Sequence, residues 1–402
     1  MEKKIMRTKL MALIYLTPFA VLICSLAFAN NYPFPRNATY DYGILPTEYN
    51  AQDVQTIYET WRNAYYEEQD DLARIKSDDP NQTVSEGIAY GMLIMVFMDN
   101  EINDTQDAFD KLWRYYNNFL NDNGLMHWKI NGFNEVVGWD ATSDAEVDAA
   151  LALIMAYKQW GETQYLIDAK ALIAKIREHE VNDNKYLKPG DAWDDKKNPS
   201  YFFTVAFKLF AEIDTEYTSF WNEVIANSYS LILAARDTTT GLVPEWCDES
   251  GTSDDPFFKY DAIRVPWRMA WAYLWYGDTE AYTIADDISS WIKTKVSHDP
   301  SLIIDGYNLD GSVIGEWNNP TFVGGFASGA LVNSQHQAWL DSSYTHLLLF
   351  TGEESYFNKT LQVLYALLAT GNMPNLWGEG SGQNTGNTDN NAFLSAIFLL
   401  LL

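Results

Sequence analysis

Three carboxylates, each in its own short motif, are the residues of this sequence best suited to carry chemistry. Glu86 and Asp144 each lie at the start of an apolar stretch, and Asp261 lies three residues before Arg264. Pairs of carboxyl groups, one protonated and one ionised, cleave glycosidic bonds by general acid–base catalysis. The three carboxylates therefore indicate a site that cleaves sugars as the first hypothesis.

Glu86 is the candidate general acid. Apolar residues follow it, among them Ala89, Tyr90 and Met92. A carboxyl group held against apolar surroundings is desolvated, so its pKa rises and it stays protonated. The alternative is that Glu86 only complements the helix dipole from the first turn.

Asp144 belongs to an acidic cluster with Glu146 and Asp148 at a predicted helix start. Either Ser143 or Asp144 could be an ordinary N-cap. Three acids in five residues also resemble the oxygen ligands of a divalent cation. The favoured interpretation is a carboxylate that contacts substrate, with no metal.

Asp261 has two interpretations. It could form an ion pair with Arg264 on one helical face, or it could be an ionised base kept charged by that neighbouring cation. Other chemistry has little support, because the five histidines are scattered and no nucleophile elbow, P-loop or dinucleotide fingerprint is present. We therefore expect no cofactor.

The first 29 residues predict a secretory signal peptide. Four basic residues precede an apolar stretch, and Ala27-Phe-Ala29 offers small residues for cleavage. The alternative is a membrane anchor. Loss of four basic residues and one acidic residue would change the formal charge from −28 to −31. Such a surface disfavours nucleic acid and anionic lipid. We expect a secreted, extracellular or periplasmic monomer, free of the membrane after cleavage, with Cys247 as its one cysteine.

Helical periodicity dominates the remaining chain, and β alternation is scarce. Polar segments containing Gly and Pro separate the helices, and no linker divides them. This pattern predicts an all-α (α/α)6 barrel over residues 30–377, followed by a polar segment and a short apolar tail over 378–402. The expected helices span 51–71, 85–98, 105–121, 145–160, 163–179, 200–210, 217–235, 260–276, 280–296, 334–350 and 355–370.

The motifs resemble glycoside hydrolase family 8, which includes bacterial endoglucanases, xylanases, lichenases and chitosanases. The likeness covers about residues 32–377. It is carried by Ser85-Glu-Gly, Thr142-Ser-Asp-Ala-Glu, Asn198-Pro-Ser-Tyr201, Tyr260-Asp-Ala-Ile-Arg264 and Asn358-Lys-Thr-Leu. One departure is Glu146, where the family signature usually has Asp. Another is Glu354, where the family has a Tyr that contacts sugar, in front of Tyr356-Phe357.

The resemblance implies an inverting mechanism. Glu86 would be the general acid and Asp261 the general base. Asp144 would contact the distorted sugar, and Tyr201 would position the attacking water.

Aromatic residues make up 15% of the chain, and rings of this kind stack on sugar faces. Substrate contacts are expected from Trp128, Trp193, Trp246, Tyr90, Arg264, Tyr356 and Phe357.

The leading hypothesis is an endo-β-1,4-glucanase acting on a polysaccharide. Xylanase, lichenase and chitosanase activities of the same family remain open. A non-catalytic polysaccharide-binding toroid would need neither acid nor base. A polysaccharide lyase would act on a uronic acid polymer, which the acidic surface would repel.

Overall fold

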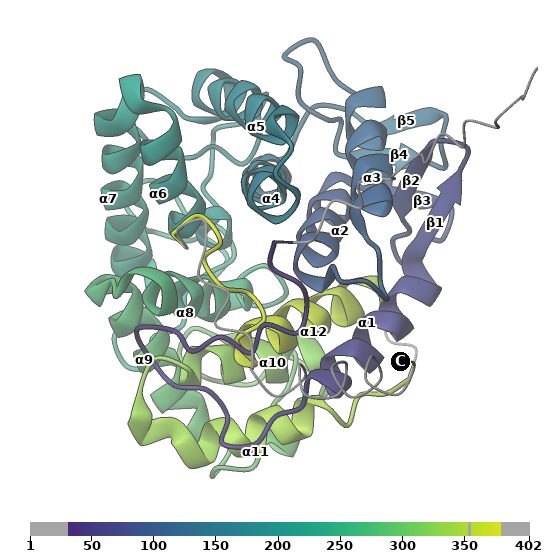
Figure 1. Cartoon of the computed structure of the whole chain (residues 1–402). Coiled ribbons are helices and arrows are strands. Elements are labelled where there is room, and N and C mark those ends of the chain that lie inside the picture. Colours follow the sequence, from purple (N-terminus) through teal and green to yellow (C-terminus); the bar gives the residue numbers. More distant parts are fainter. Residues whose placement is uncertain (1–30, 353–354, 379–402) are drawn as a thin grey trace, which may run out of the picture.

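The computed structural model describes residues 31–352 and 355–378, which form a double ring of helices (Figure 1). The inner helices are α2 (Ser85–Met98), α4 (Ser143–Trp160), α6 (Thr204–Ile213), α8 (Arg264–Tyr276), α10 (Pro320–Ala330) and α12 (Tyr356–Ala369). The outer helices are α1 (Ala51–Tyr65), α3 (Gln106–Asn118), α5 (Thr163–Lys175), α7 (Thr218–Ala235), α9 (Thr279–Lys295) and α11 (Gln337–Leu347).

Each inner helix packs on the next, and α12 closes the ring against α2. The outer helices pack one against each inner helix, with α1 against α12. Burial follows from composition: every residue of α2 except Glu86 is buried, whereas amphipathic α3 buries only one face. The predicted all-α (α/α)6 barrel is confirmed.

The N-terminal segment crosses the end of the barrel where the inner helices finish (Figure 1). The Arg36 amide donates to Asn372 Oδ1 over 2.7 Å, beyond the end of α12. The Ile44 amide donates to the carbonyl of Leu331, beyond α10, over 2.7 Å. The N-terminal segment, held by these bonds, therefore covers one end of the barrel. The N-termini of the inner helices lie at the opposite end.

Short strands lie in the loops between the helices. They are β1 (Tyr66–Gln69), β2 (Leu72–Ile75), β3 (Gln82–Val84), β4 (Lys129–Asn131), β5 (Glu135–Gly138), β6 (Phe257–Phe258) and β7 (Tyr307–Asn308). Strands β1–β2, β3–β4–β5 and β6–β7 form antiparallel sheets. The predicted helix over 51–71 was too long, because the chain leaves α1 at Tyr65 and turns through Asp70 into the β1–β2 hairpin.

Short helical turns lie between several of these elements. They are η1 (Ile176–Glu180, a π-helix) and the 3₁₀ turns η2 (Pro199–Tyr201), η3 (Thr215–Tyr217), η4 (Pro300–Leu302) and η5 (Ser334–His336).

Helix α10 was missed in the sequence because it contains three glycines, which have low helix propensity. The structure gives the reason for them. A Cβ on Gly324 would lie 2.2 Å from the ring of Tyr365, and one on Gly325 would lie 2.7 Å from Ile263. Close packing against α12 and the start of α8 therefore requires glycine.

No helix within residues 31–352 and 355–378 is long and apolar enough to cross a membrane. The predicted signal peptide over 1–29 lies outside the described residues, as does the tail beyond Gly378.

Candidate active site

A single guanidinium group joins the three motif carboxylates. Arg264 Nη1 lies 2.7 Å from Glu86 Oε2 and 3.0 Å from Asp144 Oδ2, and Nη2 lies 2.7 Å from Asp261 Oδ1. The Arg264 side chain is fully buried. The three carboxylates come from three parts of the chain, and the N-termini of α2, α4 and α8 place them together.

Sharing one guanidinium group limits how far apart Glu86 and Asp261 can lie. Each carboxylate bonds a different terminal nitrogen over 2.7 Å, so their bonded oxygens are separated by two hydrogen bonds and the width of the group at most. This upper limit on the separation is compatible with the roughly 6.5–9.5 Å between the carboxyl groups of inverting glycosidases.

Glu86 occupies the first turn of α2 directly after β3, and its side chain is 16% exposed. Burial raises the pKa of Glu86 to about 7, although Arg264 opposes the shift. The hydroxyl of Tyr356 donates to Glu86 Oε1 over 3.0 Å and also favours the ionised form. Glu86 can therefore hold a proton near neutral pH and release it.

Asp144 is buried, and burial raises its pKa. Its Oδ2 bonds Arg264, whereas Oδ1 has no hydrogen-bond partner among the described residues. The N-cap interpretation was wrong: Thr142 is the cap residue and makes no side-chain cap bond, and the hydroxyl of Ser143 donates to the carbonyl of Lys188.

The cation interpretation of the Asp144 cluster does not fit either. Glu146 accepts a bond from Tyr116 over 3.1 Å, and Asp148 makes two bonds to Arg268 of 2.9 and 2.8 Å. No group of three or more metal-binding side chains occurs in the part of the chain that the structure describes.

Asp261 lies in the turn just before α8, so the predicted helix start at Tyr260 was four residues early. Its side chain is 31% exposed, the most of the three carboxylates. Asn198 Nδ2 donates to Asp261 Oδ2 over 3.1 Å, and the Asp261 amide donates to Glu245 Oε1 over 3.0 Å. The ion pair with Arg264 is therefore present, in a carboxylate that solvent still reaches.

Tyr201 ends η2, three residues after Asn198, and its ring centre lies 5.2 Å from Arg264 Cζ. Burial, followed by the charges of Asp144 and Asp261, raises the pKa of Tyr201 well above its ordinary value. The phenol therefore stays protonated and can donate a hydrogen bond within the site.

Comparison with known proteins identifies the family of this chain. The family model of glycosyl hydrolases family 8 matches residues 32–371. This chain belongs to glycosyl hydrolase family 8.

Curated relatives include endoglucanase 2 of Ruminiclostridium josui, 36% identical over 96% of this chain and 86% of that protein. Endoglucanase C of Ruminiclostridium cellulolyticum is 35% identical over 89% of this chain and 82% of that protein. Among solved structures, a β-1,3-1,4-glucanase from Paenibacillus sp. X4 superposes with a TM-score of 0.80 at 30% identity, covering 86% of this chain and 99% of that one. The chain is therefore a glycoside hydrolase.

Three of the residues predicted to contact substrate in this family 8 hydrolase are buried. Tyr90 and Arg264 are fully buried, and Tyr356 is 4% exposed. Arg264 Nη1 also donates to the Tyr90 hydroxyl over 3.3 Å. These side chains contact the carboxylates or Arg264, and their contact with substrate stays a prediction, since Asp144, the proposed sugar contact, is as deeply buried. Phe357 is half-buried, with its ring centre 5.9 Å from Arg264 Cζ.

Trp193 and Trp246 form a pair beside Tyr201. Their ring centres lie 4.9 Å apart, and Trp246 meets Tyr201 edge-on at 6.0 Å. Trp193 is 42% exposed. Trp128, 37% exposed, lies on another loop, and its carbonyl accepts a bond from the Ser85 amide over 2.9 Å. These three rings remain accessible to a sugar.

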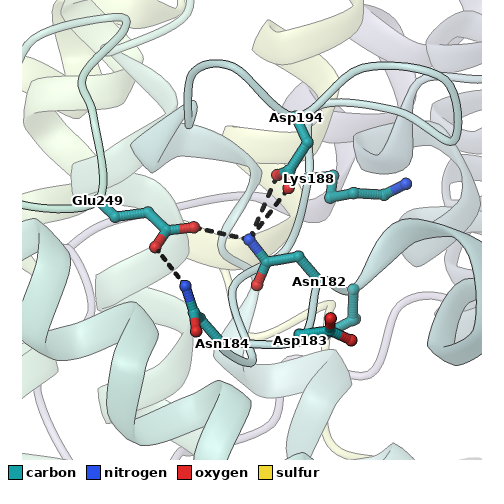
Figure 2. A pocket seen from close by; sticks show the side chains of 7 residues that line it. Asn182, Asp183, Asn184, Lys188, Asp194 and Glu249 are labelled. Atoms are coloured by element: carbon teal, nitrogen blue, oxygen red, sulfur yellow. Dashed lines mark hydrogen bonds between the residues drawn. The ribbon is translucent and has the colours of Figure 1, made fainter.

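A polar pocket is lined by Asn182, Asn184, Asp194 and Glu249, among other residues (Figure 2). Asn182 Nδ2 donates to Asp194, next to Trp193, over 3.2 Å and to Glu249, three residues after Trp246, over 2.6 Å. Asn184 donates to the second oxygen of Glu249 over 2.9 Å. Asp194 and Glu249 are held by these amides and by Lys197, so the bonds link the two loops that carry the tryptophan pair.

Several supporting residues were missed in the sequence. Asn198 lies in a motif that was noticed only for Tyr201, and Glu245 carries no local signal. The Asp148–Arg268 pair had one: Asp144 and Asp148 are four apart, as are Arg264 and Arg268, so two facing helices can pair twice.

Proposed function

We propose that this family 8 hydrolase is a secreted inverting endo-β-1,4-glucanase. The observation that carries the proposal is the placement of Glu86, Asp144 and Asp261 around one buried guanidinium group. The endoglucanase names of its curated relatives support a β-glucan substrate. A signal peptide over residues 1–29 would direct export of the chain and be cleaved after Ala29.

Glu86 is the proposed general acid. Its raised pKa keeps a proton on the carboxyl group, which it gives to the leaving glycosidic oxygen. Arg264 then stabilises the carboxylate that forms, because its guanidinium already lies 2.7 Å away.

Asp261 is the proposed general base. Its exposure gives a water molecule access, while Asn198 and Arg264 orient its two oxygens. The base takes a proton from a water that attacks the anomeric carbon on the face opposite the leaving group. Tyr201 would donate to or orient that water.

Asp144 is the proposed contact to the sugar at the cleavage point. Its Oδ1 is buried without a partner among the described residues, a costly arrangement for a carboxylate unless a ligand completes it. A sugar hydroxyl supplies the donor. This bond strengthens as positive charge develops on the ring in the transition state.

The substrate test compares reducing-sugar release on carboxymethylcellulose, mixed-linkage β-glucan, xylan and chitosan, using residues 30–402. Glu86→Gln is the control. We expect release on the first two substrates that is lost in the control. Release that survives Glu86→Gln contradicts the assignment of the acid, and release only on xylan or chitosan contradicts the glucan substrate.

Mixed-linkage β-glucan is the second candidate substrate. The superposable Paenibacillus enzyme is a β-1,3-1,4-glucanase. The same assay ranks the two, because a lichenase would release more sugar from mixed-linkage glucan than from carboxymethylcellulose.

A further inference from the structure

Five of the six inner helices bring a residue of the candidate site to their N-terminal ends. These are Glu86 at α2, Asp144 at α4, Tyr201 before α6, Asp261 before α8 and Tyr356 at α12. The sixth inner helix, α10, has no assigned role. The loop that leads into it, residues 309–319, opens at the same end of the barrel.

This loop carries Trp317, which is 69% exposed and is the most exposed tryptophan of the described residues. Its backbone is nevertheless fixed. The amides of Glu316 and Trp317 donate to Asp305 Oδ1 over 2.8 and 2.9 Å. Asn318 Nδ2 donates to the carbonyl of Ile303 over 2.8 Å. A large apolar ring is thus held in solvent by an ordered backbone.

The same anchor reaches the catalytic turn. The hydroxyl of Tyr260, the residue before Asp261, donates to Asp305 Oδ2 over 2.8 Å. Asn319, the N-cap of α10, donates to that hydroxyl over 3.1 Å. Tyr260 is itself 38% exposed. Asp305 therefore anchors both the backbone of Trp317 and the turn that carries Asp261.

The order of the helices in the inner ring indicates the direction in which a bound glucan chain would run. Helices α4 and α10 lie opposite each other in the inner ring, as do α2 and α8 (Figure 1). The loop before α4 carries two exposed tryptophans, Trp128 and Trp139, the latter 66% exposed. A chain running from that loop to the loop before α10 would pass between Glu86 of α2 and Asp261 beside α8.

We propose that Trp317 is a distant sugar-binding platform at the α10 end of the cleft, which stacks on a pyranose of the bound glucan several residues from the cleaved bond. Its ordered backbone lowers the entropy lost on binding. A neutral sugar is the occupant favoured by the charges, because Asp305 accepts a bond from the Trp317 amide and Glu316 precedes Trp317, and carboxylates in this segment repel an anionic polymer. The role rests on the proposed glucanase function.

The test measures kcat/KM of the parent, Trp317→Ala and Trp317→Phe on cellotriose, cellotetraose, cellohexaose and mixed-linkage β-glucan, all of which are neutral. We expect Trp317→Ala to lower kcat/KM about 5–30-fold on the two longest substrates and by less than about 2-fold on cellotriose, because a short chain does not reach the ring. Trp317→Phe should recover most of the loss. Ile102→Ala is the control, since Ile102 is 89% exposed between α2 and α3, where the inner helices end.

Binding of cellohexaose to Glu86→Gln, with and without Trp317→Ala, is measured by calorimetry alongside. Weaker binding in the double variant supports the platform. An equal loss of kcat/KM at every length, or no loss at any length, overturns it while the glucanase function stands. A parent that hydrolyses no β-glucan overturns the proposed function and the platform together.

Discussion

Arg264 organises the chemistry at the scale of single residues, because it makes three carboxylates share one positive charge. Two of them are raised in pKa by burial, and Arg264 opposes the shift. Replacing either member of the proposed acid–base pair should therefore disable turnover without removing the charge network. We expect Glu86→Gln and Asp261→Asn each to lower kcat by about 10²–10⁴-fold with an unchanged circular dichroism spectrum. Near-parental turnover in either folded variant would remove that residue from the pair.

The pKa of Glu86 also sets a limit on activity in alkali. Because Glu86 must be protonated to act, kcat/KM should fall as the pH rises through about 7. The Tyr356 hydroxyl stabilises the ionised form, so Tyr356→Phe should raise the pKa of Glu86 and move this limb to higher pH. Tyr344→Phe is the control, since the hydroxyl of this buried tyrosine has no partner among the described residues. A limb that stays in place in Tyr356→Phe would separate the limb from Glu86.

The sequence singled out the three carboxylates that the structure brings together, because each stands in a motif. It could not predict that Tyr356 would be buried beside Glu86 and Tyr90 beside Arg264, since burial depends on which face of the barrel lining each residue occupies. Asn198 and Glu245 act on Asp261 from distant loops, and no local pattern marks such contacts.

Two parallel ion pairs link helices α4 and α8 at the scale of elements. Asp144 pairs with Arg264 and Asp148 with Arg268, and the second pair is entirely buried. Asp148→Ala would leave a buried guanidinium group without its partner, so we expect the free energy of unfolding to fall by about 3–5 kcal/mol. Urea titration measures the change.

The exposed pair between Lys111 and Asp107 provides the matched control. Asp107 is 69% exposed, so Asp107→Ala should cost about 0–1 kcal/mol. If both variants lose the same small amount, the Asp148–Arg268 pair does not stabilise the packing of α4 on α8.

The prediction of helices succeeded where apolar periodicity is strong. It failed where glycines or turn residues determine the local structure. Helix α10 uses Gly324 and Gly325 for contact with α12 and α8, and this need appears only in three dimensions. The β1–β2 hairpin follows α1 without a break, and its turn at Asp70 carries a positive φ of 56°.

At the scale of the whole molecule, the barrel buries carboxylates that the proposed reaction does not use. Glu146 and Glu180 are both fully buried, and both oxygens of Glu180 lack partners among the described residues. Burial, together with the charge of Glu146, raises the pKa of Glu180 well above its ordinary value of 4.5. The folded protein therefore holds a proton that the unfolded chain loses above pH 4.5.

It follows that stability should decline as the pH rises above 4.5, and that part of this decline belongs to Glu180. In Glu180→Gln, the free energy of unfolding should depend less on pH above the ordinary pKa of 4.5. Glu216→Gln, an exposed site, should leave the slope unchanged. An unaltered slope in Glu180→Gln would mean that Glu180 does not bind a proton in the folded state.

The sequence predicted the architecture of the barrel only in outline. It did not predict which end the N-terminal segment covers or which end gathers the N-termini of the inner helices. Helix count and spacing predict a double ring, but they do not say which loops meet above its centre. Bonds from the N-terminal segment to the ends of α10 and α12 close one end, and this leaves the three carboxylates at the other.

The central claim is that Asp261 activates water on the face opposite Glu86, so that the sugar is released with inverted configuration. Proton NMR during the first minutes of cellopentaose hydrolysis measures this directly, before mutarotation mixes the anomers. The account predicts that the new reducing end appears first as the α-anomer. Initial release of the β-anomer would indicate a covalent intermediate and would contradict the role of Asp261 as a base.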